Sequence, residues 1–388
     1  MDRTQKDKIL TDAARKIVLL SGPRQVGKTT LSKMLTDSFD YLNYDYPDHR
    51  LLIADRAWDR NKQLVILDEL HKMKQWKSWL KGIYDVEGIP PGLLVTGSAR
   101  LDMIRKTGDS LAGRYFHHRL HPVDVKESRG LFDPDQALAR LIEVGGFPEP
   151  FLEGDPAFYG RWRRTHLDVI LRQDLVDLES VHSVQSIETL IELLRRRVGS
   201  PVSHANLAGD LQCDSKSVKR WILMLENLYV LFPVRPYSKK LSRSLLKAPK
   251  YYFLDSGQVE GDPGARLENV VACALLKEIH GRQDRLGEAL ALHYLRTKDG
   301  REIDFALTRA GEVTQLVEVK HNDPKPSRHF EHFRKTFPEA RAVQLVQHLD
   351  RERTYPDGLE VRKASTWLSG LDLAPLSSPR GATARYRD

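Results

Sequence analysis

The 388-residue chain is poor in cysteine and has no long apolar run. Its two cysteines, Cys213 and Cys273, are too few for a disulfide framework or a four-cysteine metal site. The longest apolar stretches, near residues 64–67 and 270–276, are far shorter than the roughly 20 residues of a membrane span, and the N-terminus lacks the apolar core of a signal peptide. We therefore expect a cytoplasmic protein with no membrane partner.

The composition is that of a folded protein, and its positive charge is unevenly distributed. Hydrophobic residues make up 40% and charged residues 29% of the chain, which excludes a mainly disordered, collagenous or fibrous protein. At about 150 residues per domain, the length predicts two or three domains. The net charge is +8, and residues 186–250, with twelve Lys and Arg against five Asp and Glu, hold +7 of it. This clustering favours a ligand with a phosphate backbone, such as DNA.

A phosphate-binding loop follows the first expected strand. The apolar run at residues 16–20 leads into GPRQVGKT and an amphipathic helix. Glycines at both ends of this loop let its backbone N–H groups surround phosphates, and the helix adds its positive N-terminal end. We expect Lys28 to reach the β- and γ-phosphates of ATP and to be catalytic, and Thr29 to bind Mg²⁺. The full nucleotide-binding set is Gly22, Pro23, Arg24, Gln25, Val26, Gly27, Lys28, Thr29 and Thr30.

Two acids follow the next buried run, at residues 63–67. At the carboxyl end of a strand, Asp68 would hold Mg²⁺ through water and Glu69 would polarise the attacking water as a catalytic base. A third strand, at residues 92–97, leads to Ser98, which we expect to contact the nucleotide near its γ-phosphate. An exposed acidic turn is the alternative interpretation of the acid pair.

In this order, the segments GPRQVGKTT, LVILDEL, VTGSAR, SLAGRY, LHPVDVKE and GGFPEP resemble AAA+ ATPases whose P-loop domain is fused to a C-terminal domain of formerly unknown function. The resemblance covers the N-terminal half. It implies a parallel α/β sheet, ATP hydrolysis with Mg²⁺ and assembly into a homo-oligomer. It also implies that Arg114 acts near a nucleotide as a catalytic finger, in the same or a neighbouring subunit. A surface ion pair is the alternative for this arginine, and the GGFPEP turn is expected to be a structural corner.

The basic middle of the chain predicts a winged helix. Helices expected at 187–197, 203–211 and 215–229 are followed by two short strand-like runs. On the third helix, Lys216, Lys219 and Arg220 share one face, where they would bind the DNA backbone, and residues 238–243 could form the wing. No Asn or Gln pair is present there to read bases. A protein-binding module with a merely solvated basic face is the alternative.

Acidic residues also mark two strands near the C-terminus. Asp304 lies early in one strand, and Glu318 and Lys320 end the next, fourteen to sixteen residues later, with Glu268 on a preceding helix. Two carboxylates could hold Mg²⁺ while the lysine orients the attacking water. The series EN…EIDF…EVK resembles the PD-(D/E)XK nuclease fold, which implies possible phosphodiester cleavage at these four residues. The alternative is that the acids only pair with basic residues across the sheet.

The chain is thus expected to be α/β throughout, in five parts. These are a P-loop AAA-type ATPase domain with a parallel sheet (1–135), a helical lid or linker (136–185), a winged helix (186–255), a PD-(D/E)XK nuclease-like α/β domain (256–370) and a loosely ordered tail (371–388). We expect Mg²⁺-dependent ATP hydrolysis coupled to DNA binding. An ATP-gated nuclease and a nucleotide-dependent switch that binds a protein partner are the alternatives.

Overall fold

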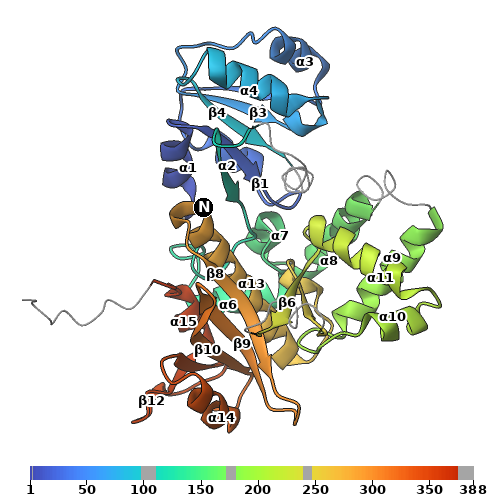
Figure 1. Cartoon of the computed structure of the whole chain (residues 1–388), viewed down its shortest axis with the longest axis vertical. Helices are drawn as coiled ribbons and strands as arrows, with labels where there is room; N and C mark the ends of the chain where they lie inside the picture. Colours follow the sequence, from blue (N-terminus) through green and yellow to red (C-terminus); the bar gives the residue numbers. More distant parts are fainter. Residues whose placement is uncertain (2, 98–110, 172–180, 239–246, 375–388) are drawn as a thin grey trace, which may run out of the picture.

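The computed structural model describes residues 1, 3–97, 111–171, 181–238 and 247–374 (Figure 1). Its N-terminal part is a five-stranded sheet in the order β2-β3-β4-β1-β5, and every neighbouring pair is parallel. The strands are β1 (Ile17–Ser21), β2 (Phe39–Asn43), β3 (Leu64–Asp68), β4 (Gly92–Thr96) and β5 (Tyr115–Arg119). The mixed α/β architecture and the parallel sheet expected from the sequence are therefore confirmed.

Burial on both faces explains the apolar strands of this sheet. All residues of β1, β3 and β4 are buried. Alternate side chains enter two separate apolar clusters: Val18 and Ile66 belong to one, and Ile17 and Val65 to the other. The accompanying helices are α1 (Lys6–Ala13), α2 (Lys28–Lys33), α3 (Pro47–Ala54), the one-turn helix η1 (Leu70–Lys72) and α4 (Trp76–Val86).

Helices follow β5 along the chain. They are α6 (Pro134–Val144), α7 (Pro148–Glu153), α8 (Pro156–Val169), α9 (Val181–Arg195), α10 (His204–Asp210) and α11 (Ser215–Asn227). Next come the antiparallel strands β6 (Leu231–Pro236) and β7 (Lys250–Phe253). Three helices followed by two strands are the order expected for residues 186–255, and the winged helix itself stays a prediction. Of the predicted wing at residues 238–243, all but Ser238 lies outside the described residues.

The C-terminal part is an eight-stranded mixed sheet in the order β12-β13-β11-β10-β9-β8-β6-β7. Its further elements are η3 (Ser256–Gln258), α13 (Pro263–Leu286), β8 (Leu290–Arg296), β9 (Glu302–Arg309), β10 (Glu312–Lys320), α14 (His329–Thr336), β11 (Arg341–Val346), β12 (Arg353–Thr354), β13 (Glu360–Lys363) and α15 (Ala364–Ser369). Strand β6 pairs with β8, so the boundary expected at residue 255 falls within a continuous sheet. The five-part division itself stays a prediction.

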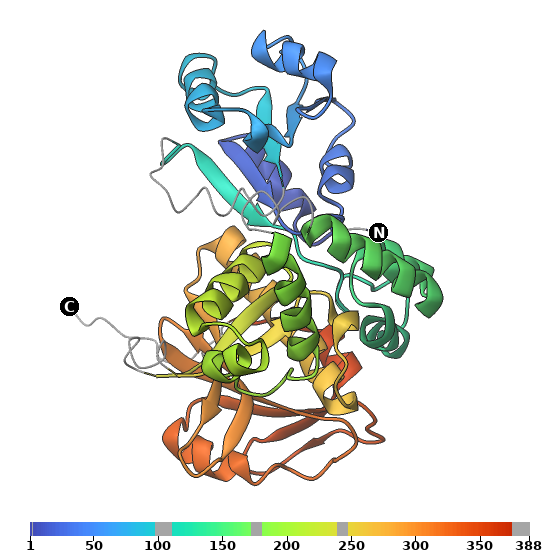
Figure 2. The same cartoon turned by 90° about the vertical axis from the view of Figure 1, so that its right-hand side faces the viewer.

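Helix α13 joins the two sheets (Figures 1 and 2). Its C-terminal half contacts β5 and the residues that follow it. Asp284 forms an ion pair with Arg119 (2.5 Å), Lys277 with Glu127 (2.6 Å), and the His280 ring lies against His121. Among the residues that the structure describes, no helix is both long and apolar enough to cross a membrane.

Candidate nucleotide site and carboxylate cluster

The predicted phosphate-binding loop connects β1 to α2 at the carboxyl edge of the parallel sheet. Gly22 has φ +150°, and a Cβ there would lie only 2.4 Å from the carbonyl oxygen of Leu120, so a side chain would clash. Gly27, with φ +93°, adopts the left-handed conformation just before α2. The Lys28 ammonium donates hydrogen bonds to the carbonyl oxygens of Gly22 (3.0 Å) and Pro23 (2.7 Å), which holds it against the loop.

Asp68 ends β3 and is held by hydroxyl groups from three other elements. Thr29 Oγ1 and Tyr41 OH each donate to its Oδ2 at 2.8 Å, and the buried Thr96 donates to Oδ1. Burial, together with the hydrogen bond to Asp68, raises the pKa of Tyr41 to about 12, so this phenol stays a donor. The adjacent Thr29 hydroxyl and Asp68 carboxylate are hard oxygen ligands and fit a Mg²⁺ ion.

Sequence reasoning missed both Tyr41 and Thr96. The signal available for Thr96 is its position at the end of a buried strand, but the sequence points to Ser98, two residues further on. Ser98 lies outside the described residues. Tyr41 gave no signal, because its role depends on β2 lying beside β3.

Glu69 follows Asp68 with a left-handed backbone (φ +57°), which turns the chain into η1. Its Oε2 lies 3.3 Å from Lys72 Nζ and 3.6 Å from His71 Nε2. Burial raises the pKa of Glu69, and the charge of Asp68 adds to this effect, whereas Lys72 and Lys28 lower it. The carboxylate is therefore a stronger base than an exposed glutamate, as a residue that polarises water needs to be.

The GGFPEP turn and α8 pack behind the loop. Pro148 of this turn has its Cγ 3.8 Å from where a Cβ on Gly27 would lie. From α8, His166 contacts the rings of Phe147 and Trp162 at centroid distances of 4.8 and 4.5 Å. Burial lowers the pKa of His166 to about 4, so the ring is neutral at pH 7. The turn thus has the structural position expected for it.

Arg114 lies at the amino-terminal ends of the parallel strands, whereas the loop lies at their carboxyl ends. Its carbonyl accepts a hydrogen bond from the N–H of Ile17 at the beginning of β1, whereas the loop follows the last residue of that strand. Five strand residues span about 16 Å. The Arg114 guanidinium pairs instead with both carboxylate oxygens of Asp85, at 2.7 and 3.1 Å. The fold does not bring Arg114 to the loop of its own chain, and a role toward a neighbouring subunit stays a prediction.

The predicted DNA-contacting residues lie on the exposed face of α11. Lys216, Lys219 and Arg220 are all exposed, while Val218, Trp221 and Ile222 are among the residues on its buried face. Two other basic residues of the segment are not available at the surface, although Arg196 and Lys247 are exposed. Arg195 is 4% exposed and hydrogen-bonds Gln258, and Lys250 is fully buried. The exposed positive charge of the segment is thus smaller than a count of its basic residues indicates.

The C-terminal carboxylate cluster contains all four residues predicted from the D…ExK pattern. Glu268 projects from α13, Asp304 from β9, and Glu318 and Lys320 from β10. Lys320 Nζ lies 2.8 Å from Glu318 Oε1, and the N–H of Val319 donates to Asp304 Oδ2 at 2.8 Å.

Burial, together with the charge of Asp304, raises the pKa of Glu268 to about 7 and that of Glu318 to about 8. Glu302, which the sequence offers only as an acid that pairs with basic residues across the sheet, also belongs to the cluster, and Lys250, which the sequence does not predict there, lies at its centre. Lys250 had been counted only as part of the basic surface charge.

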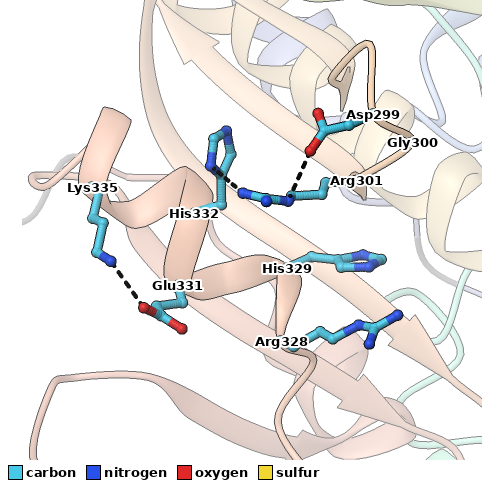
Figure 3. A pocket seen from close by; sticks show the side chains of 8 residues that line it. All are labelled: Asp299, Gly300, Arg301, Arg328, His329, Glu331, His332 and Lys335. Atoms are coloured by element: carbon cyan, nitrogen blue, oxygen red, sulfur yellow. Dashed lines mark hydrogen bonds and ion pairs between the residues drawn. The ribbon is translucent and has the colours of Figure 1, made fainter.

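A surface pocket of about 610 Å³ lies between the turn that joins β8 to β9 and the beginning of α14 (Figure 3). Arg301, Arg328 and Lys335 line it, with Arg301 paired to Asp299 and Lys335 to Glu331. His329, which also lines the pocket, hydrogen-bonds the backbone oxygen of Glu302 at 2.8 Å. The pocket is thus polar and connected to the cluster through backbone.

Comparisons with known proteins agree with the N-terminal geometry. Residues 14–128 match an AAA domain family, whereas residues 135–260 and 263–365 match two families described only as domains of unknown function. An uncharacterised protein of Mycobacterium tuberculosis and one of Mycobacterium bovis are each 27% identical over 80% of this chain and 72% of theirs. An uncharacterised protein of Methanocaldococcus jannaschii is 22% identical over 64% of this chain and 62% of its own length.

Two solved structures are distantly similar. RuvB of Thermotoga maritima has 17% identity over 59% of this chain and 87% of its own, with a TM-score of 0.29. A signal transduction ATPase with numerous domains from Pyrococcus horikoshii has 12% identity over 74% of this chain and 48% of its own, with a TM-score of 0.25. Such TM-scores carry no structural argument. The family match supports an AAA-type, ATPase-like domain at the N-terminus.

Proposed function

We propose that the chain is a Mg²⁺-dependent ATP hydrolase of the AAA type whose turnover responds to DNA bound at the helical segment around α11. The observation that carries the hydrolase is the convergence of Lys28, Thr29 and Asp68 at the carboxyl edge of a parallel sheet, within a segment that matches an AAA domain. A chance glycine turn would not bring a loop lysine, a helix hydroxyl and a carboxylate from another strand together.

Each of these side chains has a distinct role in the proposed reaction. Lys28 binds the β- and γ-phosphates, and Thr29 and Asp68 hold the metal ion. Mg²⁺, when bound, supplies positive charge that stabilises the phosphate oxygens. Thr96 and Tyr41 fix the Asp68 carboxylate by hydrogen bonds. The Glu69 carboxylate takes a hydrogen bond from the attacking water and orients it.

The proposed coupling to DNA depends on a contact between the helical segment and the loop. Tyr229 lies two residues after α11, and its OH is 3.1 Å from Oγ of Ser21, the residue just before Gly22. Tyr229 has φ +60°, a left-handed conformation that a tyrosine rarely adopts. A shift of α11 when Lys216, Lys219 and Arg220 bind phosphates would therefore reach the start of the nucleotide loop.

The first test is steady-state phosphate release from ATP with Mg²⁺, alone and with duplex or single-stranded DNA. Lys28→Ala serves as the blank, and we expect it to abolish release. Equal rates in the wild type and this variant would contradict the hydrolase. Hydrolysis that depends on Lys28 but ignores DNA would retain the ATPase and remove DNA as its effector.

The DNA contact is tested separately by the salt dependence of binding. Replacing Lys219 and Arg220 by alanine should weaken DNA binding and lower the salt slope by about two if both side chains contact phosphates. The control replaces two exposed lysines outside α11, Lys74 and Lys298, by alanine. It removes the same charge and should leave the slope unchanged. An equal effect in both double variants would mean that net charge, rather than this helix face, attracts DNA.

A further inference from the structure

We propose that the C-terminal carboxylate cluster carries its own cation, the Lys250 ammonium, in the place that a divalent metal ion would need. The inference is independent of the proposed ATPase. It concerns the position where the D…ExK pattern predicts Mg²⁺, and the residues present there do not fit that ion.

The distances place the ammonium among three carboxylates. Lys250 Nζ lies 2.7 Å from Glu302 Oε1, 3.2 Å from Glu268 Oε1 and 3.7 Å from Asp304 Oδ1. The Lys250 side chain is 0% exposed. Burial by itself would lower its pKa, but Glu268, Asp304 and Glu302 raise the pKa above its ordinary value, so the group stays charged. A lysine ammonium has three N–H donors, which matches the number of acidic side chains around it.

The backbone and neighbouring rings fix Lys250 in this position. It is the first residue of β7, and its backbone forms a bridge with Pro201. Tyr252, two residues further and hence on the same face of the strand, donates its OH to Glu268 Oε1 at 2.6 Å. The Tyr294 ring lies below the ammonium, with its centroid 5.5 Å from Nζ. The lysine is thus built into the site rather than resting on it from the surface.

Three of the remaining carboxylate oxygens contact other cations or donors, whereas Oε2 of Glu318 is buried with no hydrogen-bond partner among the described residues. Glu302 Oε2 pairs with Arg296 at 2.9 Å, in addition to the Glu318–Lys320 pair and the Val319 N–H on Asp304. Mg²⁺ needs oxygen ligands in near-octahedral geometry at 2.0–2.1 Å. It could not bind the oxygens of Glu268, Glu302 and Asp304 that face the ammonium while Lys250 stays in place. Consistent with this, within the described ranges no group of three or more His, Cys, Asp and Glu side chains is arranged to hold a metal ion.

In this arrangement the cluster is an ion-pair centre that joins the β6–β7 hairpin to α13 and β9. The metal-dependent cleavage implied by the nuclease resemblance would require the Lys250 side chain to leave. From the sequence, the alternative to a metal site is that the acids pair with Arg301, Lys298 and Lys320. The structure shows ion pairing, but the central partner is Lys250.

Mn²⁺ binding to the full-length, nucleotide-free protein tests the proposal, with free Mn²⁺ followed by electron paramagnetic resonance. We expect the wild type and Asp304→Asn to bind Mn²⁺ identically. Lys250→Met, which keeps a side chain of similar length without charge, should gain one site at least tenfold tighter than any in the wild type. The double variant Lys250→Met/Asp304→Asn should lose that site. Any binding at the nucleotide loop is common to all four proteins and cancels.

Two outcomes would overturn the proposal. The first is Mn²⁺ binding by the wild type that Asp304→Asn removes, because a metal would then displace or coexist with Lys250. The second is a folded Lys250→Met protein, verified by circular dichroism, that gains no site. Should Lys250→Met not fold, Lys250→Gln replaces it, and the comparison of the wild type with Asp304→Asn still decides.

Discussion

Removing the charge of Lys72 should move the pH dependence of ATP hydrolysis. Lys72 Nζ lies 3.3 Å from Glu69 Oε2 and lowers the pKa of this carboxyl, which burial raises. The proposed reaction needs Glu69 ionised to orient water. In Lys72→Met the pKa of Glu69 should therefore rise further, so that a larger fraction of the enzyme is protonated, and inactive, on the acid side of the profile.

The geometry of the pair sets the size of this shift. Two unit charges at this separation interact by about 1 kcal/mol in water and about 5 kcal/mol at an effective dielectric constant of about 20. The side chains of Lys72 and Glu69 are 34% and 20% exposed, and Lys72 is shared with Asp45, so the lower figure applies. About 1 kcal/mol corresponds to an upward movement of the acid limb by somewhat less than one pH unit.

The assay is kcat for phosphate release at saturating ATP between pH 5 and pH 9. Above the pKa of Glu69 in both proteins, the rates of Lys72→Met and the wild type should be equal. The matched control is Lys74→Met, the same substitution at an exposed lysine two residues away, which should leave the profile in place. Superimposable profiles for Lys72→Met and the wild type, or a movement toward lower pH, would refute the assignment of Glu69 as the group that must be ionised.

Three further predictions follow from contacts of the nucleotide loop and its supports. Thr96→Val keeps the shape of the buried residue but removes the hydroxyl that donates to Asp68. The free energy of unfolding in urea should fall by about 2 kcal/mol. An unchanged free energy of unfolding would show that this hydrogen bond does not stabilise the fold. Tyr229→Phe should leave hydrolysis without DNA near the wild-type rate and reduce its stimulation by DNA; undiminished stimulation would exclude the Ser21 contact as the coupling path. His166 has a pKa of about 4 in the folded protein and about 6.5 in the unfolded chain, so below about pH 6.5 the unfolded state binds the extra proton. The free energy of unfolding should therefore fall as the pH is lowered, by up to about 3 kcal/mol near pH 4. Thermal melts of the wild type and His166→Phe between pH 4 and pH 8 should show a smaller acid loss in the variant, and equal losses would assign the effect to other groups.

Local signals in the sequence were sufficient for the strand, loop and helix that carry the candidate nucleotide site. Backbone conformation here is set by neighbours along the chain, because the apolar run of β1, the loop glycines and Lys28 at the beginning of α2 all lie within one short segment. The same holds for α11, because Asp214 caps its first turn and the buried residues recur at helical spacing. In the C-terminal part, the positions of Asp304 and Glu318 on successive strands were enough to bring them together, since β9 and β10 form an antiparallel pair.

Only the tertiary structure decided which distant residues meet. Strand order places Thr96 and Tyr41 on Asp68, and the parallel pairing of β5 with β1 places Arg114 at the amino end of the strands, away from its own loop. The pairing of β6 with β8 brings β7 into the C-terminal sheet, and with it Lys250 into the carboxylate cluster. These contacts depend on register and on the packing of elements far apart in the sequence. The sequence near a residue does not specify a partner far away in the chain. Lys250 stands in a basic segment like its neighbours, and only the packing of the sheet buries it among three acids.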